Sequence, residues 1–196
     1  MTAPVKLNFK VYQGSTFSEV LRWESSTKVY KTITAITKAA PTVITAVAHG
    51  LPVGWRTKVT NVVGMTSINS TDTYNTVSAV TTDTVTLNDI NSLGYTAYTS
   101  GGVLEYNAPV DMTSFTARMQ IRPSLTSTTT IKELTTINGG ILLDNTLKTI
   151  TIFMSATDTA AFTFSTAVYS LELVSSGGIV TQLVTGNMSL VQEVTR

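Results

Sequence analysis

The chain contains no cysteine, one histidine and few charged residues. The lack of cysteine among its 196 residues excludes a disulfide scaffold and a thiolate metal site. Charged residues make up 13% of the chain, against about 25% in an average globular domain. The formal net charge is +1, so no basic field exists to attract nucleic acid. We therefore expect no cofactor and no nucleic-acid partner.

Long apolar runs are also missing. No run approaches the ~18 apolar residues that are needed to span a bilayer. The first ten residues, MTAPVKLNFK, include no apolar stretch of secretory-signal length. We expect a soluble protein without a membrane span, made in a reducing cytoplasm.

Threonine and valine dominate what is present. Threonine alone accounts for 38 residues. Threonine is β-branched, stiff at χ1 and favoured in strands. Disordered chains have low hydrophobicity and high net charge, whereas this chain has 42% hydrophobic residues and low net charge. We therefore expect a folded protein. The composition predicts an all-β protein.

The first runs alternate with the period of a half-buried strand. Residues 5–12, VKLNFKVY, put Val5, Leu7, Phe9 and Val11 on one face, and residues 17–24, FSEVLRWE, follow after a Gly-containing turn. We interpret the two runs as a hairpin. Glu19 interrupts the apolar face of the second run, and the pattern offers no reason for it.

From residue 32 to residue 104 the pattern of the sequence changes, and threonine, valine, asparagine and glycine are frequent. Short strand-like pieces recur between turn signals: TVITAVAH, RTKVTNVV, YNTVSAV and DTVTLNDI. Strands this short and this regularly spaced indicate a small closed or nearly closed barrel.

Longer alternating runs with charged outer faces return after residue 108, beginning with FTARMQIR at 115–122. We infer a host domain, residues 1–30 plus 108–196, with a guest barrel of residues 31–107 inserted in an early loop. Such an insertion is inexpensive because loop-closure entropy grows slowly with length. The strand count of the host predicts an immunoglobulin-like antiparallel β-sandwich. Its last strand, GIVTQLVTGNMSLV, is expected to bend or bulge at Gly186.

The stretch SATDTAAFTFSTAVYSLELV, residues 155–174, interrupts the strands with a short helical turn. In immunoglobulin-like sandwiches such a turn carries the chain between the sheets, and a tyrosine then bonds back to the nearby backbone. We assign this corner to Asp158, near the positive end of the turn, and to Tyr169. The alternative is that Tyr169 is an ordinary core aromatic residue.

Candidates for catalysis and metal binding are weak. A Ser-His-Asp arrangement would need His49, which lies before a glycine in a turn and has no Gly-x-Ser-x-Gly motif beside it. Asp72, Asp83 and Asp89 lack the dense acidic spacing of a calcium loop. We expect no catalytic residue, no metal site and no enzymatic activity.

Two surfaces are candidates for binding. Arg118, Gln120 and Arg122 share one face of a strand and could form an interface, or a plain solvated face. Trp55, Tyr95 and Tyr98 could stack on a glycan or a receptor, although such aromatics more often pack at a barrel rim.

Several segments together resemble a family of virion proteins of tailed bacteriophages. In chain order they are FKVYQGSTFSEVLRW, DMTSFTARMQIRPS, NGGILLD, KTITIFMSATDTAAF, AVYSLELVSSGG and EVTR. The host domain is similar to the immunoglobulin-like domain of phage baseplate and tail proteins. The intervening segment looks like a phage β-barrel cassette that is labelled after a half-domain of the ubiquitin-activating enzyme. That label implies no thioester chemistry here, because the chain has no cysteine.

The resemblance implies a structural part of the tail, collar or baseplate, or an adaptor for fibres or spikes. It implies location in the virion after assembly in the host cytoplasm, and a symmetric homo-oligomer in contact with other virion proteins, portal-proximal ones included. The N-terminal strand, residues 5–12, or the C-terminal strand could pair with a neighbour. Alternatives are a glycan- or receptor-binding module at the tail tip and a capsid decoration protein.

Overall fold

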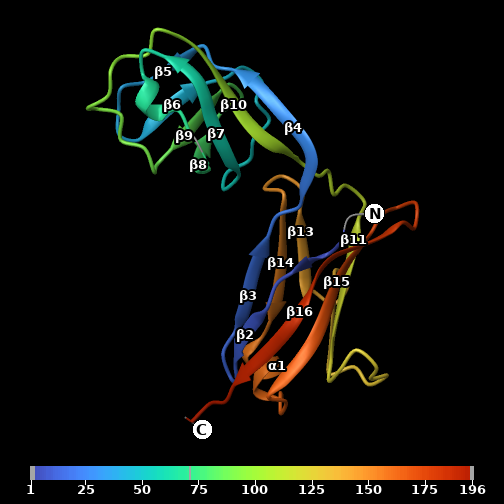
Figure 1. Ribbon diagram of the computed structural model, residues 1–196. Helices are drawn as coiled ribbons and strands as arrows, with labels where there is room; N and C mark the ends of the chain where they lie inside the picture. The colour runs from blue at the N-terminus through green and yellow to red at the C-terminus, as the bar shows by residue number, and fades with distance from the viewer. Residues whose placement is uncertain (1–2, 71, 195–196) are drawn as a thin grey trace. The chain divides into compact units, whose positions relative to one another are not determined.

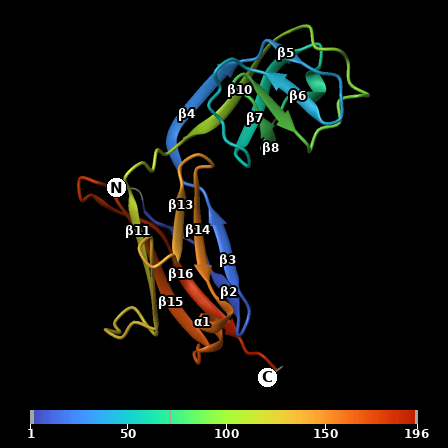
Figure 2. The ribbon, with the colours of Figure 1, turned by 180° about the vertical axis from the view of Figure 1, so that it is seen from behind.

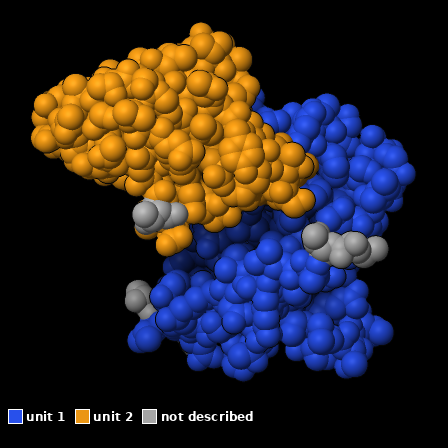
Figure 3. Space-filling model, turned by 45° about the horizontal axis from the view of Figure 1, so that its top comes forward, with its two compact units in different colours: residues 1–23, 111–196 blue, residues 24–110 orange. Residues whose placement is uncertain are grey.

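The computed structural model describes residues 3–70 and 72–194, so the end of the EVTR segment lies outside the described residues. The protein is all-β, with mostly antiparallel sheets and one short α-helix (Figure 1). The chain divides into two compact units, shown in different colours in Figure 3. Unit 1 comprises Met1–Trp23 and Asp111–Arg196, and unit 2 comprises Glu24–Val110.

Unit 1 is a β-sandwich of two sheets, which face each other in Figures 1 and 2. The six-stranded sheet contains β1 (Val5–Lys6), β2 (Phe9–Tyr12), β11 (Thr116–Arg122), β12 (Lys132–Thr135), β15 (Thr166–Val174) and β16 (Val180–Val191). The three-stranded sheet has the order β13 (Ile141–Asp144), β14 (Thr149–Met154) and β3 (Phe17–Leu21).

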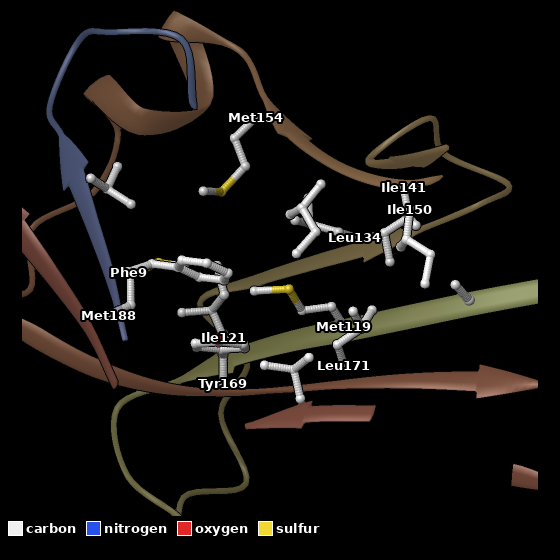
Figure 4. Packing of buried hydrophobic residues seen from close by; sticks show 14 of the residues in the cluster. Phe9, Met119, Ile121, Leu134, Ile141, Ile150, Met154, Tyr169, Leu171 and Met188 are labelled. Carbon is white, nitrogen blue, oxygen red and sulfur yellow. The ribbon is translucent and has the colours of Figure 1, made fainter. Parts of the chain in front are cut away.

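The core of unit 1 lies between these sheets, as Figure 4 shows. Alternate residues of each strand enter it, because successive side chains of a strand point to opposite faces. Met119, Ile121 and Leu171 come from the six-stranded sheet, and Ile150 and Met154 come from the facing one. The alternation that the sequence shows at 115–122 and 149–154 is thus the alternation between core and solvent.

The predicted N-terminal hairpin is wrong. β2 pairs in parallel with β16, whereas β3 pairs antiparallel with β14 in the other sheet. The turn between them therefore carries the chain from one sheet to the other. A period-2 pattern identifies a strand but not its partner, so two successive strands with a short turn were read as a pair.

The helical turn predicted after residue 154 is α1 (Ala156–Ala160), which connects β14 of one sheet to β15 of the other. Ser155 and Asp158 form a capping box: the serine hydroxyl accepts the Asp158 N–H, and the carboxylate accepts the Ser155 N–H. Asp158 also accepts a hydrogen bond from Lys132, which is the main reason why the pKa of its carboxyl lies below the ordinary value.

The corner hypothesis expects Tyr169 to bond to the backbone a few residues upstream, but its hydrogen bond is elsewhere. Its hydroxyl donates to the Leu7 carbonyl at 2.7 Å, 162 residues away in the chain. Its ring is buried and stacks on Phe9, with ring centroids 4.8 Å apart. Burial raises the pKa of the Tyr169 phenol, and the charge of Glu19 contributes. Tyr169 therefore attaches the N-terminal strand to the sandwich.

The expected irregularity at Gly186 takes another form. The register between β15 and β16 shifts at Leu183, because Leu171 faces Val184 while Glu172 faces Gln182. Gly186 faces Tyr169, and a Cβ built on it would lie 1.8 Å from the Leu7 carbonyl oxygen. Only a glycine lets the N-terminal strand approach this closely.

Unit 2 is one seven-stranded sheet around its own core. Its strand order is β4-β10-β7-β8-β9-β6-β5. The strands are β4 (Glu24–Thr32), β5 (Ala35–Ile36), β6 (Thr42–Thr45), β7 (Arg56–Val63), β8 (Asn75–Val80), β9 (Thr84–Leu87) and β10 (Ser100–Pro109), and a 3-10 helix, η1 (Thr66–Ile68), follows β7. The two strands at the ends of this order, β4 and β5, are consecutive in the chain.

The predicted limit of the guest domain at residue 31 falls inside β4, which belongs to unit 2 throughout. β4 pairs along its length with β10, so its first residues cannot be separated from the sheet. The sheet order is open between β4 and β5, and closure into a barrel stays a prediction.

Candidate functional site

The predicted interface residues lie on the outer face of the six-stranded sheet of unit 1. Arg118 forms an ion pair with Glu172 at 2.8 Å, across from β11 to β15. Gln120 donates to Glu133 at 2.8 Å and accepts from Arg122. A hollow of about 310 Å³ is lined by Arg118, Gln120, Glu133, Ser170 and Glu172, and Arg122 lies outside this lining. The structure thus brings the three residues together in a cross-strand polar network, and their role as an interface stays a prediction.

The predicted glycan-binding aromatics do not form a surface. Trp55 is fully buried in the core of unit 2, and its indole N–H donates to the Asn107 carbonyl at 2.9 Å. The prediction that Trp55 stacks on a sugar is therefore wrong. Tyr95 and Tyr98 are partly buried against the same core, and the Tyr98 hydroxyl donates to the Ile33 and Gly101 carbonyls.

His49 is buried and holds a turn of unit 2 by backbone contacts. Its Nδ1 accepts the Leu51 N–H at 3.0 Å, so the ring proton is on Nε2. Nε2 lies 2.9 Å from the Thr81 carbonyl and 3.1 Å from the Thr84 carbonyl. The Tyr106 hydroxyl donates to the His49 carbonyl, and burial raises the pKa of that phenol. Both ring nitrogens thus form hydrogen bonds with the backbone that stabilise the turn.

The three loop aspartates of unit 2 have different environments. Asp83 accepts the Ala48 N–H at 2.8 Å, and Asp89 accepts the Thr76 N–H at 3.3 Å. Asp72 is exposed. Within residues 3–70 and 72–194, no three metal-ligating side chains are grouped in a way that could hold an ion.

A hollow of about 530 Å³ lies beside α1 in unit 1. Apolar side chains and the Lys132–Asp158 ion pair line it. The lining residues include Pro123, Ile131, Ala161, Phe162 and Phe164. Because the two charged groups already bond to each other, the hollow is suited to apolar contacts and not to catalysis.

The outer face of the three-stranded sheet carries exposed apolar side chains, and we call this set the apolar face. Leu142 of β13 and Val20 of β3 both face Thr151 of β14, and Phe153 follows on the same side of β14. Leu142 is 65% exposed, Val20 51% and Phe153 43%. Neighbouring strands lie about 4.8 Å apart, so Leu142 and Val20 are about 10 Å apart on either side of β14, and Phe153 lies diagonally between them on β14. Contiguous exposed apolar groups on a folded protein commonly mark an interaction site.

Glu19, which the sequence left unexplained, lies at the end of the same sheet. It faces Ile152 in the register of β3 and β14, on the side that faces the core. β3 ends the strand order of its sheet. A charge that points inward on an edge strand discourages pairing with another chain. The free edge of β3 is therefore protected, whereas the apolar face beside it is open.

Most of the C-terminal strand is not the docking edge that the sequence suggested. β16 lies inside the six-stranded sheet, with β15 on one side and β1 and β2 on the other. The strands β1 and β2 pair with residues 184–185 and 188–191 of β16, whose other side pairs with β15. β1 and β2 form the outer strands at this end of the sheet.

Sequence reasoning missed a polar cluster on the outer face of β4, β10 and β7 in unit 2, which we call the tyrosine–cation face. Here the guanidinium carbon of Arg56 lies 4.7 Å from the centre of the Tyr74 ring, and Lys58 Nζ lies 4.8 Å from it. Arg56 also binds Glu24 through two bonds of 2.6 Å, and Lys28 bonds to Glu105. These hydrogen bonds raise the pKa of both Arg56 and Lys28. The residues lie far apart in the sequence, so no local motif reveals them.

Comparison with protein-family models and with curated proteins gives no match. In the part of the chain that the structure describes, no helix has the length and apolarity needed to cross a bilayer.

Proposed function

We propose that the protein is a non-catalytic structural component of a tailed-phage virion, in the tail, collar or baseplate, where it docks on other virion proteins. The apolar face of unit 1 carries this proposal. A sandwich that buries one side of a three-stranded sheet and leaves Leu142, Val20 and Phe153 outside is suited to permanent burial of those side chains by a partner.

The proposal also takes support from the segment order of the sequence, which resembles phage tail and baseplate proteins. The contacts of His49 and Asp158 are consistent with it, because these groups stabilise a turn and a helix cap. The partner is another virion protein, which includes a neighbouring copy of this chain in a symmetric ring.

The test has two parts. Mass spectrometry of purified particles should find the protein, and its absence from the particle would end the proposal. The double variant Leu142→Ser/Phe153→Ser should fold normally but enter particles at least about tenfold less, because truncation of central apolar contacts commonly weakens an interface by more than 1 kcal/mol. Leu125→Ser is the matched control, since Leu125 is 85% exposed in a loop outside the apolar face. Normal incorporation of the double variant would contradict the assignment of the face.

A further inference from the structure

The tyrosine–cation face places two cations over one aromatic ring and a third on the neighbouring strand β4. Arg56 and Lys58 lie on the same face of β7, two residues apart, and both contact Tyr74. Lys28, on β4, forms an ion pair with Glu105 of β10. Cation–π contacts and ion pairs fix the positions of these groups before any ligand arrives.

Two of the cations, Arg56 and Lys28, are exposed, and their carboxylate partners are less so. The Arg56 side chain is 53% exposed, whereas its partner Glu24 is 17% exposed. The Lys28 side chain is 39% exposed and its partner Glu105 is 20% exposed. A ligand that approaches the sheet therefore meets positive groups first, with carboxylate acceptors within reach behind them.

An exposed aromatic ring flanks the charged groups. Tyr30 of β4 and Lys58 of β7 both face Glu105 of β10, one from each side. Tyr30 is 62% exposed. Three adjacent strands span about 10 Å from side to side. An aromatic ring that can stack, cations and carboxylates thus lie side by side on three adjacent strands.

We infer that the tyrosine–cation face binds a carboxylate-bearing glycan. The ring of Tyr30 can stack on the apolar C–H face of a pyranose, and Arg56 and Lys58 can bind the sugar carboxylate. Glu24 and Glu105 accept hydrogen bonds from sugar hydroxyls, as Asn107 can through its carboxamide. Asn107 is held in place by its own bond to Glu24 at 3.0 Å.

The same groups disfavour nucleic acid as the ligand. Unit 2 contains five basic and five acidic residues, so it has no net charge to attract a phosphate chain. Glu24 and Glu105 lie among the cations and would repel closely spaced phosphates. A glycan carries fewer charges and many neutral hydroxyl groups, which suits a mixture of cations and carboxylates. Binding of such a glycan does not require that the protein be part of a virion.

The test is calorimetric titration of the full chain. The acidic probes are galactose oligomers that end in a single galacturonic or sialic acid residue, the neutral probe is an oligomer of galactose, and single-stranded oligo-dT represents nucleic acid. We expect at least one acidic probe to bind about tenfold or more tighter than the neutral probe. Tyr30→Ala and Lys58→Gln should each weaken that binding by about tenfold.

Two matched variants serve as controls. Tyr12→Ala removes an exposed tyrosine of unit 1, and Lys38→Gln removes an exposed lysine of unit 2 that lies outside the face. Both should bind within about twofold of the unchanged protein. The inference is overturned if neither acidic probe binds at millimolar concentration, if neutral and acidic probes bind equally, if oligo-dT binds most tightly, or if Tyr30→Ala and Lys58→Gln bind like the controls.

Discussion

The carbonyl oxygen of Leu7 lies so close to Gly186 that a Cβ there would be 1.8 Å away from it. The same oxygen accepts the Tyr169 hydroxyl, and Tyr169 faces Gly186 across β15 and β16. Gly186 thus allows the N-terminal strand to approach β16 closely, and the Tyr169 hydroxyl holds it there.

Gly186→Ala should destabilise unit 1, because the added Cβ forces the Leu7 backbone away from Tyr169. Overpacking of this kind costs roughly 1–3 kcal/mol. Urea unfolding measures the change. Gly177→Ala is the control, since the nearest atom to its Cβ would be 3.9 Å away. Equal stability of the two variants would show that the close approach is not a constraint.

Tyr169→Phe keeps the ring that stacks on Phe9 but removes the donor to Leu7. A carbonyl left without its partner in a buried site costs about 1–3 kcal/mol. We expect that loss in urea unfolding, together with faster hydrogen exchange at the Leu7 amide, which bonds to the Thr185 carbonyl at 2.9 Å. Tyr12→Phe, at an exposed tyrosine, should change neither measurement.

His49→Ala should destabilise unit 2, since it removes the acceptor of the Leu51 N–H and the donor to the Thr81 and Thr84 carbonyls. We expect a loss of about 2–4 kcal/mol. The chain has two tryptophans, Trp23 in unit 1 and Trp55 in unit 2. In a Trp23→Phe background the fluorescence of Trp55 reports the unfolding of unit 2 alone. An unchanged midpoint would contradict the structural role of His49.

The pKa of the Asp111 carboxyl is lowered to about 2, chiefly because it accepts the Thr113 hydroxyl and then the Asn145 amide. A carboxyl whose pKa is depressed by folding stabilises the protein above its ordinary value, near 3.8, and this contribution is lost as the pH falls toward 2. Thr113→Val should raise the pKa of Asp111, as NMR titration of its carboxyl carbon can measure. Thr146→Val, at an exposed threonine nearby, should leave it unchanged.

The sequence predicts the elements of this protein better than their partners. Alternation at Ala117, Met119 and Ile121 identifies β11, and the segment that begins at Ser155 identifies the helical turn α1 with Asp158 in its first turn. Both signals are local, and both are confirmed. The parallel pairing of β2 with β16 brings together residues about 180 positions apart, which no local pattern can specify.

The candidate surfaces were predicted less well for a related reason. Trp55 was predicted to stack on a glycan or a receptor, yet its indole N–H donates to the Asn107 carbonyl and the ring is buried. The tyrosine–cation face depends on the register of β4, β10 and β7, and the apolar face depends on that of β13, β14 and β3. Register becomes known only from the three-dimensional structure.

The position of β16 has a consequence for the order of folding. β1 and β2 are the earliest strands in the chain, but their pairing partner is the latest, so they must wait for it during synthesis. Every strand partner of unit 2 lies within Glu24–Val110, so its sheet can form while the rest of the chain is still being made. Unit 2 can thus fold first, and the sandwich of unit 1 is completed only after β16 has been synthesised.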